Sequence, residues 1–261
     1  MEKNYITDFG FVPRLYNYDA ISENIIREGY TQSRGRFTLT KFYKDSKIFD
    51  NYRYFNLSNN TYWDDQGEVS QSRSVLNNDL TFKNQSSIYG WLIHEYVNLK
   101  YAFDPLNNGN AIEVDQYNYV NSGLGYSSAD NKKLQYGGSL SYGNYYSGRR
   151  NRLAANVQYI LMPLVRFQLR YERNDIDLKE LGSDTFHLAQ FTGEVFFSNR
   201  LNWTTYVQYN TQYDNFNINS RLQWEYKPLS YIYLVVSDDY KQDIARQSWG
   251  VAFKMNYRFD F

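Results

Sequence analysis

The final stretch of the chain, WGVAFKMNYRFDF at Trp249–Phe261, alternates between apolar and polar side chains. Successive side chains of a β-strand point to opposite faces, so such a segment is apolar on one face and charged on the other. A strand that crosses a bilayer at a tilt needs about 9 to 11 residues and an apolar outer face. The segment therefore predicts a membrane-spanning strand. Its apolar residues are Trp249, Val251, Phe253, Met255, Tyr257, Phe259 and Phe261, and its polar residues are Lys254, Asn256, Arg258 and Asp260.

The composition agrees with this interpretation. Aromatic residues make up 19% of the chain, yet its mean hydropathy is −0.70. The sequence has no run of about 18 apolar residues, which excludes a spanning helix. A closed barrel is then the remaining way through a bilayer, because hydrocarbon offers no partner to an unpaired backbone group. The 28 Lys and Arg residues balance the 28 Asp and Glu residues, which argues against a nucleic-acid partner, and the absence of Cys excludes disulfides and thiolate metal sites.

Strand-like alternation recurs along most of the chain. It is clearest in Val165–Arg173, Arg200–Gln212 and Phe216–Tyr226, where helical spacing would mix the two sets of side chains. Less regular candidates are Arg36–Tyr43, Phe49–Trp63, Val69–Lys83, Tyr89–Phe103, Ile112–Tyr126, Leu134–Tyr146, Arg152–Leu161, Thr185–Phe197 and Tyr231–Tyr240. We predict an all-β fold, an antiparallel transmembrane β-barrel with about 12 to 14 strands in this chain, either whole or as the C-terminal part of a larger barrel.

Short turns and long loops alternate between these candidates. The turns are Met162-Pro163, Ser198-Asn199 and Pro228-Leu229, and the loops are Asp104–Ala111, Asn174–Asp184 and Asp238–Ser248. Barrels of the bacterial outer membrane place short turns on the periplasmic side and long loops outside. With a periplasmic C-terminus, the three long loops are expected to face the exterior.

The N-terminal part is harder to divide. We expect residues 1–34 to form a loop or partial strand that continues from a missing upstream part, and residues 35–261 to form the barrel strands. If Arg36–Tyr43 is the first strand, the count is odd, whereas a single-chain barrel has an even number of strands. MEKNYITDFG also has no apolar core of a signal peptide. We therefore expect a signal sequence and at least one strand upstream.

The two faces of the predicted strands give the candidate site residues. The lumen is expected to be lined by Arg152, Arg166, Arg170, Glu172, Arg221, Glu225, Lys254 and Arg258. The lipid is expected to contact Phe167, Leu169, Leu222, Trp224, Val251, Phe253, Met255 and Tyr257. The charges on the polar face are mixed in sign, which favours weak ion selectivity. Neither His94 nor His187 has neighbours that indicate catalysis, so we predict no catalytic, cofactor or metal site.

Two stretches resemble a known family. GFVPRLYNYDA at Gly10–Ala20 and VQYNTQYDNFNINSRLQWEYKPLSYIYLV at Val207–Val235 resemble the C-terminal barrel domain of large Bacteroidota outer-membrane proteins. Those proteins carry an N-terminal carbohydrate-binding-like module and are often labelled membrane-associated hydrolases. Tyr257, Phe259 and the terminal Phe261 also resemble the signal by which such barrels are recognised for assembly. The resemblance implies lipid and the barrel-assembly machinery as partners, and an oligo- or polysaccharide bound through an upstream module.

The predicted function is that of a porin-like outer-membrane barrel, acting as a passive pore, an anchor or a platform for an upstream domain. The alternative is a membrane-associated hydrolase or carbohydrate-binding protein whose active module lies upstream of this chain. A third class, a soluble β-sandwich or adhesin, predicts a folded monomer without detergent.

Overall fold

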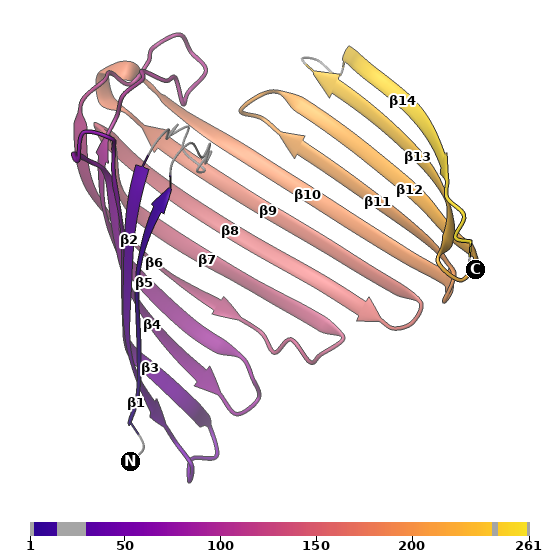
Figure 1. Ribbon diagram of the computed structural model, residues 1–261, viewed down its shortest axis with the longest axis horizontal. Helices are drawn as coiled ribbons and strands as arrows, with labels where there is room; N and C mark the ends of the chain where they lie inside the picture. The colour runs from indigo at the N-terminus through magenta and orange to yellow at the C-terminus, as the bar shows by residue number, and fades with distance from the viewer. Residues whose placement is uncertain (1–2, 15–29, 242–244, 260–261) are drawn as a thin grey trace. The chain divides into compact units, whose positions relative to one another are not determined.

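The computed structural model describes residues 3–14, 30–241 and 245–259, the first range through its backbone. These residues contain fourteen β-strands and one short 3₁₀ helix, η1 (Lys179–Leu181) (Figure 1). The strands are β1 (Lys3–Arg14), β2 (Tyr30–Phe42), β3 (Phe49–Trp63), β4 (Val69–Phe82), β5 (Ser87–Asn98), β6 (Gln116–Ser127), β7 (Leu134–Tyr145), β8 (Gly148–Leu161), β9 (Val165–Asp177), β10 (Ser183–Ser198), β11 (Leu201–Asn210), β12 (Asn215–Lys227), β13 (Ser230–Lys241) and β14 (Ala245–Met255). In the described part of the chain, no helix is long and apolar enough to cross a membrane.

The strands pair in the order in which they follow one another along the chain. The ladders from β1 to β6 and from β10 to β14 are antiparallel, as expected for strands joined by short turns. The predicted all-β antiparallel sheet and its strand number are thereby confirmed. β1 and β14 end the order, and no ladder joins them within the described residues, so the barrel itself remains a prediction.

The last strand differs from its prediction at both ends. β14 begins at Ala245 and ends at Met255, so the predicted strand is wrong beyond that residue. Met255 is the last residue paired with β13, and Asn256 then exchanges backbone hydrogen bonds of 3.0 and 3.2 Å with Tyr231. β13 itself begins at Ser230, one residue before Tyr231, so its ladder ends close to this pair. Residues 256–259 therefore follow the strand, and Asp260 and Phe261 lie outside the described residues.

The N-terminal region contains more strand than the sequence predicts. β1 pairs with β2 from Lys3 opposite Lys41 to Arg14 opposite Tyr30. The expected boundary between residues 34 and 35 therefore falls inside β2. With β1 included, the described residues contain fourteen strands, so the odd number of strands that led us to expect a further upstream strand is wrong. The alternation in β1 is interrupted by Gly10 and Pro13, which are unusual inside central strands but tolerated where a strand has one neighbour. Residues 15–20 of the first family-like stretch lie outside the described residues.

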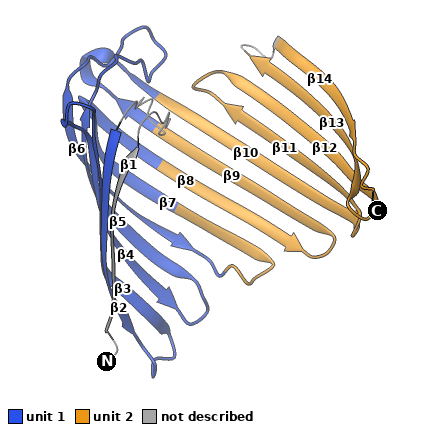
Figure 2. Cartoon of the chain, in the orientation of Figure 1, with its two compact units in different colours: residues 1–129, 139–152, 175–184 blue, residues 130–138, 153–174, 185–261 orange. Residues whose placement is uncertain are grey.

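Two compact units divide the chain (Figure 2). Unit 1 comprises residues 1–129, 139–152 and 175–184, and unit 2 comprises residues 130–138, 153–174 and 185–261. Nearly all buried apolar side chains of the described residues belong to unit 1, and Phe186 is the one in unit 2. The apolar side chains of the described part of unit 2 are therefore mostly half-buried or exposed.

Gly148, at the start of β8, is packed against the backbone at the end of β9. A Cβ at this position would overlap the carbonyl oxygen of Asp177 and lie 2.7 Å from the Cα of Leu178. We expect Gly148→Ala to lower the free energy of unfolding by about 1 to 3 kcal/mol, because the backbone must shift. Gly250→Ala is the matched control, since its Cβ would meet Ser237 Oγ at 3.5 Å, an ordinary contact. Urea titrations of both variants check this, and equal stabilities would contradict it.

Candidate functional site

The exposed face of unit 2 is apolar across neighbouring strands. The register places Trp203 of β11 opposite Leu222 of β12, Leu222 opposite Leu234 of β13, and Leu234 opposite Phe253 of β14. Their exposed fractions are 47%, 38%, 40% and 66%. Because directly opposed residues share a face of the sheet, these side chains form a continuous row. We call this surface the apolar face of unit 2.

The other predicted lipid-facing residues extend the same pattern. Trp224, Val251 and Met255 belong to the apolar face of unit 2, because Trp224 lies opposite Ile232, Val251 opposite Val236 and Met255 opposite Ile232. On β9, Phe167 and Leu169 are also exposed, and Phe167 stacks on Phe191 of β10 with ring centroids 6.3 Å apart.

Polar groups on the apolar face bind one another. Trp203 Nε1 donates a hydrogen bond of 2.6 Å to Ser220 Oγ, and Ser220 Oγ lies 3.0 Å from Thr205 Oγ1. These three residues are on β11 and β12, and Ser220 is two residues from Leu222 on the apolar face of unit 2. Hydroxyl groups that face hydrocarbon have no water to bind, so pairing within the face is what a lipid-facing surface requires.

The opposite face of unit 2 carries the charges predicted for a lumen. Arg166 is half-buried on β9, and its Nε and Nη2 each donate a hydrogen bond of 2.7 Å to a carboxylate oxygen of Glu194 on β10. Farther along the same faces, Gln190 Nε2 donates to Gln208 Oε1 at 3.2 Å. These two pairs are half-buried polar groups on the side opposite an exposed apolar face, which reverses the pattern of a soluble sheet.

The remaining predicted lumen residues have varied surroundings. Arg170 and Arg221 are exposed, whereas Glu172 is half-buried and accepts a hydrogen bond of 2.7 Å from Asn174. Glu225 accepts a hydrogen bond of 2.9 Å from the backbone N–H of Leu229, so it also stabilises the turn after β12. Lys254 of β14 lies opposite Tyr233 of β13 and is exposed. Arg152 is exposed on β8, in unit 1.

The bidentate ion pair gives a measurable coupling. In a double-mutant cycle of Arg166→Gln and Glu194→Gln, we expect a coupling energy of about 1 kcal/mol. The value is discounted because the Arg166 side chain is 43% exposed and the Glu194 side chain 15%. Salt screens exposed charges, so the coupling should decrease when the unfolding titrations are repeated at high ionic strength. If the losses of unfolding free energy in the two single variants simply add up in the double variant, the ion pair contributes no coupling energy and the prediction is wrong.

The C-terminal segment after β14 lies beside the turn between β12 and β13. Arg258 N donates a hydrogen bond of 3.0 Å to Ser230 Oγ, and Lys227 Nζ lies 5.0 Å from the ring centroid of Tyr257. Tyr257 and Phe259 are 44% and 70% exposed, with ring centroids 4.6 Å apart. Two members of the predicted assembly signal are therefore accessible at the end of the strand, and the third, Phe261, lies outside the described residues.

Unit 1 shows the same reversed alternation in β5. Ile88 and Leu92 are each 47% exposed, whereas Ile93 and Glu95 on the other face are 8% and 3% exposed. His94 shares the exposed face with Leu92. The register continues this face to Leu76 on β4 and Leu57 on β3. His94 therefore lies on the same side of the strand as these apolar residues.

Unit 1 also contains a loop core, which we define as the 99–115 connection between β5 and β6 with its contacts. Leu106 and Ile112 are fully buried, and Phe103 packs edge-on against Tyr146 at 5.2 Å between ring centroids. Asn108 Nδ2 donates a hydrogen bond of 2.9 Å to the carbonyl of Leu181, in the connection between β9 and β10. Two of the three long loops of the sequence analysis are therefore joined at one end of the strands.

Groups of three or more His, Asp or Glu side chains that could hold a metal are absent from the described residues. His187 Nδ1 lies 2.8 Å from Tyr171 OH, and the two rings stack at 6.0 Å between centroids. This pair lies on adjacent strands of the apolar side and contacts no carboxylate that would orient it as a base.

The sequence analysis missed one cluster of charged residues. Arg34 and Arg36 of β2 and Arg73 of β4 line one cavity in unit 1. Arg34 lies within the range predicted as a loop or partial strand, so it was not predicted to share a strand face with Arg36. The spacing of two residues was the signal available, because it places both guanidinium groups on one face of a strand.

The chain matches no protein-family model, and no curated protein matches it significantly.

Proposed function

We propose that this chain forms a β-barrel in the bacterial outer membrane, where it acts as a passive pore, an anchor or a platform for an upstream domain. The observation that carries the proposal is the apolar face of unit 2, in which large side chains from β11 to β14 are in register and exposed. Contiguous exposed apolar surface of this extent marks contact with a membrane or partner. The mutual hydrogen bonds of Trp203, Thr205 and Ser220 favour lipid over water as the contacting phase.

Membrane insertion also requires the sheet to close. A strand edge exposed to hydrocarbon leaves backbone N–H and C=O groups unpaired, at a cost of several kcal/mol each. The proposal therefore requires that the free edges of the end strands are paired in the membrane, either within this chain or, if it is the C-terminal part of a larger barrel, with further strands. The paired charges of Arg166 and Glu194 then face the lumen.

The polar face suits a passive pathway. Arg166, Glu194, Gln190 and Gln208 provide both donors and acceptors, and the charges of the first pair neutralise each other. A pathway lined by such neutralised and uncharged groups discriminates weakly between ions, because these four side chains carry no net charge. The family-like stretches support the same location and an upstream carbohydrate-binding module as a partner.

Reconstitution tests the proposal. Protein refolded in detergent should insert into liposomes, resist extraction by alkaline carbonate and give an ohmic conductance with weak ion selectivity in planar bilayers. Insertion without conductance would support the role of anchor or platform and would exclude the role of pore. A folded, detergent-free monomer that does not bind liposomes would overturn the membrane proposal and favour the soluble sandwich or adhesin.

A further inference from the structure

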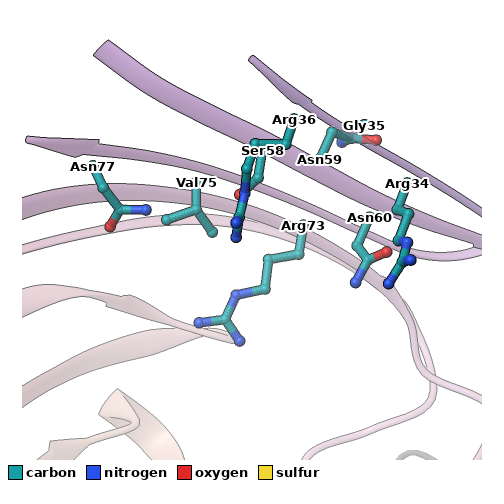
Figure 3. A pocket seen from close by; sticks show the side chains of 9 residues that line it. All are labelled: Arg34, Gly35, Arg36, Ser58, Asn59, Asn60, Arg73, Val75 and Asn77. Carbon is teal, nitrogen blue, oxygen red and sulfur yellow. The ribbon is translucent and has the colours of Figure 1, made fainter. Parts of the chain in front are cut away.

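A cavity of about 470 Å³ lies against β2, β3 and β4 in unit 1 (Figure 3). Its volume is within the usual range for small-molecule sites, which is about 300 to 1,000 Å³. The side chains of Arg34, Asn60, Arg73 and Asn77 project to one side of these strands (Figure 3). The six polar lining residues that matter here are Arg34, Arg36, Ser58, Asn60, Arg73 and Asn77.

The strand register explains why three cationic side chains line the same cavity. Asn60 of β3 lies opposite Arg34 of β2 on one side and opposite Arg73 of β4 on the other. Arg36 lies two residues from Arg34, opposite Ser58 of β3. Because directly opposed residues share a face, the three guanidinium groups project from the same face of adjacent strands.

These arginines lack the partners that other cations of the chain have. Arg166 and Arg246 form ion pairs of 2.7 Å, whereas Arg34, Arg36 and Arg73 make none with the described residues. All three are exposed to the cavity. Like charges on one face repel one another, so an anion that binds among them would relieve this repulsion.

The two carboxylates nearest in register are Glu95 and Asp8. Glu95 of β5 lies opposite Arg73, but it is only 3% exposed and accepts a hydrogen bond of 2.6 Å from Gln71. Asp8 occupies the position of β1 opposite Arg36. Three cations against these two acids leave an excess of positive charge along this face.

Neutral hydrogen-bonding groups stand between the cations. Asn60 Oδ1 accepts a hydrogen bond of 3.0 Å from Gln32, which leaves its amide nitrogen to donate into the cavity. Ser58 and Asn77 add a hydroxyl and a second amide. Arg binds carboxylate, phosphate and sulfate through a fork of two N–H groups, whereas amides and hydroxyls match the alternating donors and acceptors of sugar hydroxyls.

We propose that this cavity binds a small polyhydroxylated anion, a sugar that carries a carboxylate, phosphate or sulfate group. Arg73 and Arg34 hold the acidic group on either side of Asn60, and Ser58 and Asn77 bind the hydroxyl groups. The site goes beyond the pore, anchor or platform role, and it does not require the barrel to conduct.

Calorimetric titration of the detergent-folded protein tests the proposal. The probes are glucuronate, glucose 6-phosphate, glucose 6-sulfate, neutral glucose, inorganic phosphate and inorganic sulfate. At least one sugar anion should bind saturably, with an affinity that falls as salt rises, and more tightly than both glucose and the matching inorganic anion. The preferred probe identifies the acidic group. Absence of saturable binding by all three sugar anions, or equal binding of an inorganic ion, would overturn the proposal.

Variants locate the binding in this cavity. Arg73→Gln should weaken binding of the preferred probe about tenfold or more, because a charged hydrogen-bonding group is lost. Arg34→Gln on a different strand provides a second variant, should the first fold poorly by circular dichroism. Arg149→Gln is the matched control, since Arg149 is exposed in unit 1 and does not line the cavity. Equal affinities of both cavity variants and the control would place the binding elsewhere and overturn the assignment. Conductance measurements are independent of this result.

Discussion

Leu222→Arg is expected to lower the free energy of unfolding in lipid by about 2 to 4 kcal/mol. Leu222 lies near the middle of β12, between Trp203 and Leu234 on the apolar face of unit 2. A guanidinium at this position must enter hydrocarbon or distort the bilayer, and either costs free energy. The measurement is urea unfolding in liposomes, followed by tryptophan fluorescence.

Gln223→Arg is the control for this prediction. Gln223 is the next residue of β12, lies between Asn202 and Tyr233 on the opposite face, and is half-buried. An added cation there faces the polar side, so the expected loss is below about 1 kcal/mol. Equal losses for the two variants would mean that the faces are assigned wrongly.

Leu106→Ala is expected to open the loop core of unit 1. Leu106 is 3% exposed and its Cδ1 lies 3.7 Å from the position of a Cβ on Gly182. Truncation of a buried Leu costs about 2 to 4 kcal/mol, which corresponds to an increase of about 30- to 800-fold in the population of the open loop. Limited proteolysis of the 99–115 connection should accelerate by a similar factor while the strands remain protected.

Val114→Ala in the same connection is the control, because Val114 is 58% exposed. Its cleavage rate should stay within a few-fold of the unsubstituted protein, since little buried area is lost. Cleavage of Leu106→Ala at the unsubstituted rate would show that the loop core contributes nothing to loop order.

The strands were largely predictable from the sequence because both faces of the sheet leave a signal. Leu222 and Trp224 alternate with Arg221 and Gln223, and β12 extends the predicted Phe216–Tyr226 by one residue at each end. The ends of the strands were less predictable where they depend on pairing with a neighbouring strand. Nothing within WGVAFKMNYRFDF indicates that the ladder with β13 stops at Met255.

Tertiary contacts explain the other differences. Phe103 and Ile112 look like strand residues, but they pair with each other in an isolated bridge of the loop core. The cluster of Arg34, Arg36 and Arg73 depends on the register between β2, β3 and β4, which no local pattern encodes. The individual faces were therefore predictable, whereas the groups that gather from different strands were not.

Accessibility measured along β12 tests the central claim most directly. The chain has no Cys, so single-cysteine variants at positions 219 to 225 can each carry a nitroxide label in lipid bilayers. Collisions with oxygen, which concentrates in hydrocarbon, should be highest at 220, 222 and 224. Collisions with a water-soluble nickel complex should be relatively higher at 219, 221, 223 and 225. The opposite alternation, or oxygen accessibility without a period of two, would contradict an apolar face turned toward lipid.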